Sequence, residues 1–177
     1  MKNKNIILMG FMGSGKTTVG KILSKDFMYK FFDTDTEIEK KTGMTVSDIF
    51  DKYGESRFRE LEIEVVEEIS EEENAVISTG GGIVLNECNM KNLCKKGYIV
   101  YLEASSEKIY DNLKDDTTRP LLANLNSQQE KLKKIQELLS KREPLYCRYS
   151  QLTVETTGKA LEQSIEYIKT HIFKEDK

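Results

Sequence analysis

The stretch GFMGSGKT at residues 10–17 places three glycines, a lysine and a threonine directly after the apolar run IILM. It matches the pattern G-x-x-x-x-G-K-[ST], whose fixed positions fall on Gly10, Gly15, Lys16 and Thr17. Glycines let such a loop curl until its backbone N–H groups and the start of the next helix face one phosphate group. Lys16 then reaches the terminal phosphates of a nucleotide, and the Thr17 hydroxyl can ligate Mg²⁺.

A chance match at a flexible turn is the alternative interpretation of this loop. A strand pattern before the loop and a helix pattern after it favour phosphate binding instead, because both are required by the motif. The residues that we expect to hold a nucleoside triphosphate are Gly13, Ser14, Gly15, Lys16, Thr17 and Thr18.

A pair of carboxylates follows in FFDTD, residues 31–35. If this segment is extended, Asp33 and Asp35 project to the same side, about 7 Å apart. One carboxylate can then serve Mg²⁺ while the other meets a second substrate. The alternative is a helix N-cap followed by solvated acids. The later run AVIST offers no carboxylate at its end, only Ser78 and Thr79, so a metal-organising acid must come from FFDTD.

Three consecutive glycines close the segment STGGG, residues 78–82. They follow an apolar strand pattern, and open α/β sheets bind ligands at the carboxyl ends of their strands. A merely flexible turn is the alternative. We expect backbone amides in this turn to approach a ligand closely, at Gly80, Gly81 and Gly82.

Three arginines complete the set of candidate functional residues. Arg59 lies on a predicted helix, opposite an apolar stripe, and Arg142 lies at the end of another. Arg119 lies in the polar segment 114–131, which interrupts the alternation of elements and is typical of a lid. Each alone is most simply a solvated surface residue. Together with Lys16 they supply the positive charge that stabilises a phosphoryl-transfer transition state.

The elements that must position these residues alternate between strand and helix, which predicts a parallel sheet with right-handed crossovers. The first, third and fourth strand patterns are nearly continuous in apolar residues, as central strands are. The predicted strands are 5–10, 30–35, 75–80, 98–103 and 151–156. The predicted helices are 15–27, 45–53, 55–70, 86–96, 105–113, 128–142 (ending before Pro144) and 158–171.

Size and charge exclude several classes of protein. The chain has 177 residues, 38% hydrophobic and 32% charged, which predicts one soluble globular domain. A net charge of −3 disfavours binding to nucleic acid. No apolar stretch approaches the roughly 20 residues of a membrane span. The three cysteines form no CxxC pair, which favours reduced thiols in a cytoplasmic protein.

Taken together, these segments resemble the shikimate kinase family. The resemblance runs from about residue 5 to 170 and is carried, in this order, by GFMGSGKT, FFDTD, FRELE, STGGG, TTRPLL and KREPLY. It implies a three-layer α/β/α P-loop fold with a five-stranded parallel sheet, a substrate-binding helical region and a lid at about 112–126. It further implies a single, monomeric domain over residues 1–177. The implied reaction transfers the γ-phosphate of ATP to the 3-hydroxyl of shikimate, a step toward chorismate and the aromatic amino acids.

The resemblance also implies roles for individual residues. Asp35 would orient or deprotonate the attacking hydroxyl, with Lys16 and Arg119 as the other catalytic residues. Asp33 would support Mg²⁺ beside Thr17. Arg59 and Arg142 would hold the shikimate carboxylate, with the backbone amide of Gly81 near the ring. Glu62 would hold Arg59 or meet a substrate hydroxyl, and Lys159 would lie near adenine. Many members carry an arginine seven positions before the lid arginine, where this chain has Asn112.

Three other functions stay open: two are kinases of other substrates and one is a nucleotide switch. A gluconate kinase or another small-metabolite kinase on the same scaffold is the nearest, although it is not expected to combine the FRELE, TGGG and RPLL segments. A nucleoside monophosphate kinase is disfavoured because no base-reading pocket is evident. A slowly hydrolysing nucleotide switch would leave the second set of carboxylates and arginines unexplained.

Overall fold

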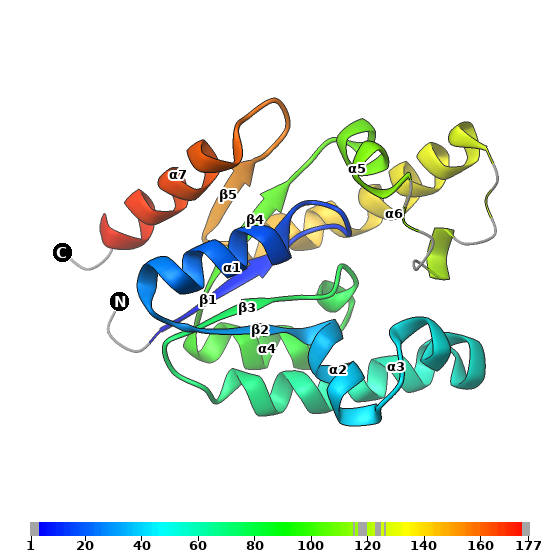
Figure 1. Ribbon diagram of the computed structural model, residues 1–177, viewed down its shortest axis with the longest axis horizontal. Coiled ribbons are helices and arrows are strands. Elements are labelled where there is room, and N and C mark those ends of the chain that lie inside the picture. Colours follow the sequence, from blue (N-terminus) through cyan, green and yellow to red (C-terminus); the bar gives the residue numbers. More distant parts are fainter. Residues whose placement is uncertain (1–3, 115, 117–119, 123–124, 126, 175–177) are drawn as a thin grey trace.

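The computed structural model describes residues 4–114, 116, 120–122, 125 and 127–174 (Figure 1). A five-stranded parallel sheet has the order β2-β3-β1-β4-β5, so the three most apolar runs are central, as predicted. The strands are β1 (Asn5–Met9), β2 (Lys30–Asp33), β3 (Ala75–Ser78), β4 (Gly97–Glu103) and β5 (Leu152–Glu155).

Helices cover both faces of this sheet, which confirms the predicted three-layer α/β/α fold. Ile6 and Leu8 of β1 belong to the core on the side of α1 and α7, whereas Ile7 and Met9 belong to the core on the side of α3, α4 and α6. The side chains of a strand alternate between its faces, so each central strand fills both cores. The helices are α1 (Lys16–Phe27), α2 (Thr34–Thr42), α3 (Val46–Ser70), α4 (Glu87–Lys96), α5 (Ser106–Leu113), α6 (Gln128–Tyr149) and α7 (Leu161–Lys174), with 3-10 turns η1 (Ile83–Leu85) and η2 (Pro120–Leu122).

Two helices differ most from the sequence prediction: α2 was not predicted as a helix, and α6 is longer than predicted. β2 ends at Asp33 and α2 begins at Thr34, where an extended segment was expected to continue. α6 runs through Pro144 to Tyr149, so the prediction that it ends before Pro144 is wrong. Proline removes the hydrogen bond to the carbonyl four residues earlier. That carbonyl belongs to the exposed Ser140, where water can satisfy it, while the buried Tyr146 anchors the following turn.

The predicted helices 45–53 and 55–70 are the two arms of α3. They meet at Gly54, whose φ of 79° and ψ of 173° interrupt the helix. At the start of α3, Thr45 and Asp48 form the capping box that their spacing predicts. The kink turns the first arm of α3 toward the open edge of the sheet (Figure 1).

Parallel pairing brings the segments that carry the candidate functional residues to one edge of the sheet. Ser78, at the end of β3, pairs in register with Leu8 of β1 and Asp33 of β2. The loop after β1, the carboxylate ending β2 and the glycines after β3 therefore meet at the carboxyl ends of the strands. This is the edge where open α/β sheets bind ligands.

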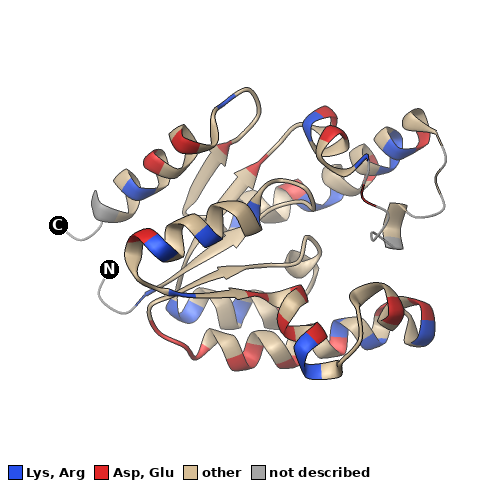
Figure 2. Ribbon diagram, viewed as in Figure 1, with Lys and Arg blue, Asp and Glu red and all other residues tan. Residues whose placement is uncertain are grey.

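The outer surface carries mixed charge. Figure 2 shows Lys and Arg interspersed with Asp and Glu along α3 and α6. The three cysteines are exposed and unpaired. Within the part of the chain that the structure describes, no helix combines the length and apolarity needed to cross a membrane. Anion binding must therefore depend on a few cations placed at the sheet edge.

Candidate active site

The loop between β1 and α1 has a conformation that requires glycine. Gly10 has a φ of 154°, and a Cβ there would lie 2.6 Å from the carbonyl oxygen of Leu102 and 2.8 Å from Ser14 Oγ. Gly15, with a φ of 94°, is the N-cap of α1 and supplies no side chain to the first turn. The first-turn N–H groups of α1 thus have no side-chain cap, and no residue of that turn is acidic. Such a helix start favours an anionic ligand.

Polar groups in this loop are held ready for a ligand. Lys16 is buried, and its ammonium group donates a hydrogen bond of 2.7 Å to the carbonyl oxygen of Phe11. Ser14 Oγ is buried without a hydrogen-bond partner. A buried hydroxyl without a partner is costly unless a ligand or water completes it. The loop therefore presents a cation, a free hydroxyl and open N–H groups together.

Asp33 and Asp35 do not occupy one extended strand, so the predicted spacing along the chain is wrong. Asp33 is the N-cap of α2, and its Oδ1 accepts from the backbone N–H of Thr36 at 3.4 Å. Its Oδ2 accepts a hydrogen bond of 2.8 Å from the Thr17 hydroxyl, which also lies 3.5 Å from Ser78 Oγ. Asp35 lies in the first turn of α2. Asp33 therefore both caps α2 and accepts a hydrogen bond from Thr17.

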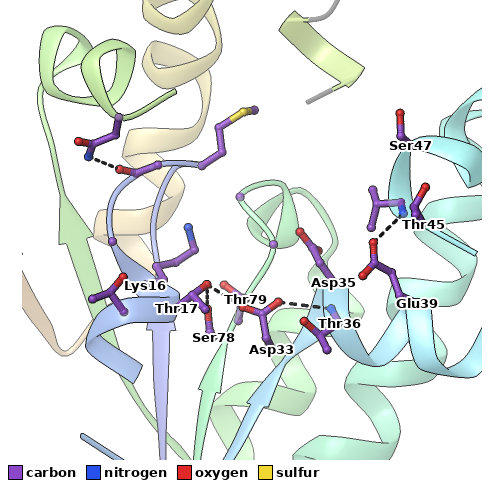
Figure 3. A pocket seen from close by; sticks show the side chains of 18 residues that line it. Lys16, Thr17, Asp33, Asp35, Thr36, Glu39, Thr45, Ser47, Ser78 and Thr79 are labelled. Atoms are coloured by element: carbon purple, nitrogen blue, oxygen red, sulfur yellow. Dashed lines mark hydrogen bonds between the residues drawn. The ribbon is translucent and has the colours of Figure 1, made fainter. Parts of the chain in front are cut away.

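A cavity of about 770 Å³ opens beside these groups (Figure 3). Lys16, Thr17, Asp33 and Asp35 line it, as do Gly80 and Gly81. Sequence reasoning missed polar lining residues from α2 and the start of α3, among them Glu39, Thr45 and Ser47. Their only signal was their position soon after the FFDTD segment. Asn112 of α5, which the sequence analysis singled out for its place before the lid arginine, also lines the cavity.

A smaller cavity of about 70 Å³ adjoins the first and shares Met12 and Asp35 with it, as well as Gly80 and Gly81. Residues 80–82 are called the glycine turn below. Arg59 lines this cavity and is clamped by two carboxylates. Its Nη2 lies 2.9 Å from Glu55 Oε1, and its Nη1 lies 2.9 Å from Glu62 Oε2. The spacings of three and four residues on one helix predict such pairs.

Glu62 is fully buried at 0% exposure, and its Oε1 has no hydrogen-bond partner. Burial raises the pKa of the Glu62 carboxyl above its ordinary value, although the positive charge of Arg59 opposes that rise. The negative charge of Asp35 raises it further. The ion pair with Arg59 is one of the two contacts that the resemblance implies for Glu62.

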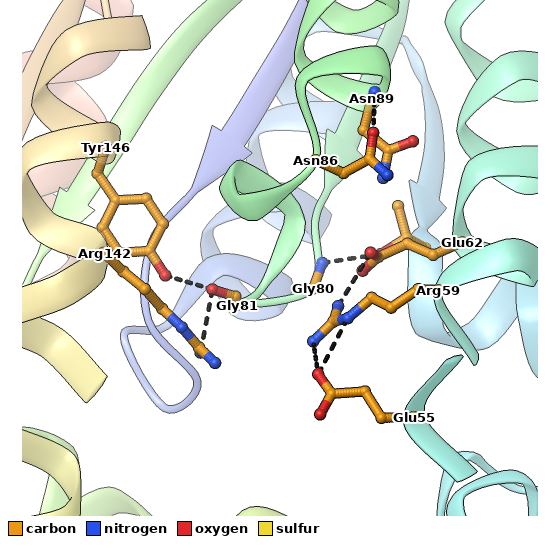
Figure 4. A network of polar contacts seen from close by, with 10 residues as sticks. Glu55, Arg59, Glu62, Gly80, Gly81, Asn86, Asn89, Arg142 and Tyr146 are labelled. Atoms are coloured by element: carbon orange, nitrogen blue, oxygen red, sulfur yellow. Dashed lines mark hydrogen bonds and ion pairs between the residues drawn. The ribbon is translucent and has the colours of Figure 1, made fainter. Parts of the chain in front are cut away.

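Arg142 meets the glycine turn from the opposite side, on α6 (Figure 4). It is only 4% exposed, and its Nη1 donates to the carbonyl oxygen of Gly81 at 3.3 Å. Its guanidinium carbon lies 5.5 Å from the centre of the Phe11 ring. Among the described residues no carboxylate lies within ion-pair distance of Arg142. A buried cation whose contacts are neutral favours an anionic ligand.

Each glycine of the turn faces a different part of the site. A Cβ on Gly80 would lie 3.0 Å from both Asp35 Oδ1 and Glu62 Oε1, and one on Gly81 would lie 2.9 Å from the backbone N of Met12. A Cβ on Gly82 would lie 2.5 Å from Arg59 Nη2. The turn thus packs simultaneously against the carboxylates, the phosphate loop and an arginine.

The structure places only one of three further predicted features, Asn112, beside the cavities. Lys159 is exposed in the turn between β5 and α7 and lines neither cavity. Arg119 lies outside the described residues, as do residues 115, 117, 118, 123, 124 and 126 of the predicted lid. Asn112 lines the larger cavity and donates a hydrogen bond of 2.7 Å to the carbonyl oxygen of Gly13. The end of α5 is thereby attached to the phosphate loop.

Residues 12–173 match the family model described as shikimate kinase. The shikimate kinase of Thermodesulfovibrio yellowstonii is 47% identical over 165 residues, covering 93% of this chain and 92% of the relative. That of Caldicellulosiruptor bescii is 47% identical over 176 residues, covering 98% and 99%. The solved structure titled shikimate kinase from Acinetobacter baumannii in complex with shikimate has a TM-score of 0.91 and 36% identity, covering 98% of this chain and 94% of that one.

Proposed function

Because the chain belongs to the shikimate kinase family, we propose that it transfers the γ-phosphoryl group of ATP to the 3-hydroxyl of shikimate. The products are ADP and shikimate 3-phosphate, and the step leads toward chorismate and the aromatic amino acids. Residues 1–177 act as a single kinase domain in this proposal. The relative from Acinetobacter baumannii, solved with shikimate, supports the choice of acceptor.

The observation that carries the proposal is the environment of Arg142. This guanidinium is buried beside the smaller cavity and has no carboxylate partner among the described residues, while Arg59 lines the same cavity. A planar guanidinium binds a carboxylate through two parallel hydrogen bonds. A hydroxylated acid such as shikimate would complete Arg142 with its carboxylate. Its hydroxyls would then meet Asp35, which lines both cavities.

The nucleotide is assigned to the larger cavity. The open N–H groups at the start of α1 and the ammonium group of Lys16 would hold the β- and γ-phosphates. Lys16 would exchange its present bond to the Phe11 carbonyl for a phosphate oxygen. Arg119 and Lys159 are proposed nucleotide contacts from the lid and from the turn before α7.

The oxygen ligands at the sheet edge fit Mg²⁺. Thr17 Oγ1 and Asp33 Oδ2 lie 2.8 Å apart, and oxygen is the ligand that this ion prefers. No cluster of three or more His, Cys, Asp or Glu side chains occurs in the described part of the chain, so phosphate oxygens and water must complete the coordination. When bound, the ion neutralises the charge that develops on the phosphates.

The chemical step needs an oriented hydroxyl and a place for its proton. The 3-hydroxyl oxygen bonds to the γ-phosphorus while the bond from that phosphorus to the β–γ bridging oxygen breaks, which releases ADP. The carboxylate of Asp35 accepts the hydrogen bond of the hydroxyl and takes up its proton. Positioning and charge stabilisation by Lys16 supply most of the rate enhancement in this chemistry.

The test is turnover with ATP, Mg²⁺ and shikimate, followed as ADP release and as a phosphorylated product. Turnover that depends on shikimate and is absent with gluconate is expected, and its absence would end the proposal. A nucleotide switch would instead hydrolyse ATP at the same rate with and without shikimate. Addition of shikimate to the ADP-bound protein should raise its melting temperature, because a second ligand binds the folded state.

A matched pair of variants tests the carboxylate site. Arg59→Lys keeps the charge but loses the bidentate fork, which should weaken shikimate binding about 10- to 150-fold. Arg57→Lys is the control, because Arg57 lies on the same helix but pairs with Glu60 at the surface. Equal affinities of the two variants for shikimate would refute the role of Arg59.

A further inference from the structure

Tyr146 has no part in the binding or chemistry described so far, yet it lies one helical turn after Arg142 and is fully buried. Its hydroxyl donates a hydrogen bond to the carbonyl oxygen of Gly81, the same atom that accepts from Arg142 (Figure 4). We propose that Tyr146 is a positioning residue, an inference that rests on the proposed function. It fixes the Gly81 carbonyl, and through that carbonyl it aims the Arg142 guanidinium at the carboxylate of the acceptor.

The two arginines of the smaller cavity are oriented in different ways. Arg59 is held by the carboxylates of Glu55 and Glu62, which neutralise part of its charge. Arg142 is held by a neutral carbonyl, so its charge stays available to an anion. A carbonyl oxygen has two lone pairs and accepts both Tyr146 and Arg142. A neutral anchor can orient a guanidinium only if the anchor itself is immobile.

Tyr146 immobilises this anchor because its own ring is fixed by the sheet. It stacks on Tyr101 of β4, with ring centres 5.0 Å apart and planes inclined by 25°. Burial raises the pKa of Tyr146, although the charge of Arg142 opposes that rise, so the hydroxyl stays protonated and remains a donor. The chain of contacts runs from β4 through both tyrosines to Gly81 and then to Arg142.

Gly81 has little room to compensate for a lost donor. The space where a Cβ would stand is filled by the backbone of the phosphate loop, with Met12 N at 2.9 Å. A shift of the turn would therefore disturb either this contact or the direction of Arg142. The Tyr146 hydroxyl is the group on α6 that fixes the carbonyl without carrying a charge.

The test compares two variants that each delete one hydroxyl from the same stacked pair. Tyr146→Phe removes the donor to Gly81. Tyr101→Phe removes a buried hydroxyl that makes no hydrogen bond to the glycine turn among the described residues, and it serves as the control. Loss of one oriented hydrogen bond should weaken shikimate binding by Tyr146→Phe about tenfold, with KM for ATP unchanged. Tyr101→Phe should bind shikimate as the wild type does.

Titration calorimetry with shikimate and steady-state kinetics measure these effects, and thermal unfolding reports the stability of both variants. A general loss of packing would lower the melting temperatures of both variants without separating their affinities. Equal shikimate affinities for Tyr146→Phe and Tyr101→Phe would overturn the proposal. A rise of KM for ATP as large as that for shikimate would overturn it as well.

A measurement without substrate separates this inference from the proposed function. The carbonyl ¹³C resonance of Gly81 should shift in Tyr146→Phe and not in Tyr101→Phe, whether or not the protein phosphorylates shikimate. Wild-type protein that fails to use shikimate would refute the proposed function alone, whereas an unchanged Gly81 resonance would refute the role of Tyr146. In the wild type the Tyr146 hydroxyl proton should exchange slowly with solvent. Rapid exchange would contradict the inference even if Tyr146→Phe does not fold.

Discussion

Substitution of Gly82 by alanine should separate stability from substrate binding. Gly82 has a φ of −98° and a ψ of 0°, a backbone conformation open to alanine, so no backbone strain is expected. The added methyl group would instead meet the Arg59 guanidinium, at 2.5 Å from Nη2, 2.7 Å from Nη1 and 2.8 Å from the guanidinium carbon. These atoms are the end of a flexible side chain, which can retreat.

The size of the effect follows from the distance that Arg59 must move. Ordinary van der Waals contact begins near 3.4 Å, so the guanidinium must retreat by about 1 Å. Its contacts to Glu55 and Glu62, both 2.9 Å, cannot survive such a shift unchanged. Losing a charge-assisted bidentate contact to the acceptor costs about 1.5–3 kcal/mol, which is about a 10- to 150-fold rise in Kd. The free energy of unfolding should change by less than about 1 kcal/mol.

Titration calorimetry with shikimate and urea unfolding of Gly82→Ala measure the two quantities. The control is a double-mutant cycle with Arg59→Ala, which removes the group that the methyl would strike. In that background Gly82→Ala should weaken shikimate binding no further. Wild-type affinity in the single variant, or full additivity in the double variant, would refute the steric reasoning.

Three further predictions concern charge and anchoring around the site. Asp33→Asn should raise the Mg²⁺ concentration for half-maximal turnover about tenfold, because Asp33 orients the Thr17 hydroxyl, and an unchanged Mg²⁺ titration would contradict this. Burial raises the pKa of Glu62, so folding takes up a proton there, and unfolding free energy is lost as pH rises from 4.5 through the raised pKa. Glu62→Gln should lack this loss in thermal unfolding between pH 4 and 7, and identical pH profiles would count against it. Asn112→Asp removes the donor to the Gly13 carbonyl and should raise KM for ATP about five- to tenfold while KM for shikimate stays constant; equal changes in both would exclude a role confined to the phosphate loop.

Local sequence patterns were sufficient for most of the elements and for the phosphate loop, although they did not predict α2 as a helix. Apolar runs without alternation predicted the central strands, because only strands covered on both faces tolerate them. The glycines of residues 10–15 predicted the loop, because its positive φ angles exclude most other residues. The spacing of Arg59 to Glu62 placed two opposite charges on one turn of a helix. All of these patterns involve residues that are close together in the sequence.

Contacts between distant segments were decided by the tertiary structure. Asp33 and Asp35 read as one extended strand, yet β2 ends at Asp33 because that side chain caps α2 and meets Thr17. Pro144 predicted the end of a helix, yet α6 continues to Tyr149, and the buried Tyr146 anchors its last turn. No local pattern brings α6 to the glycine turn or α5 to the phosphate loop. Motifs name the groups that can bind phosphate and carboxylate, but only packing of the crossovers around the sheet determines which groups share a carbonyl, a charge or a cavity.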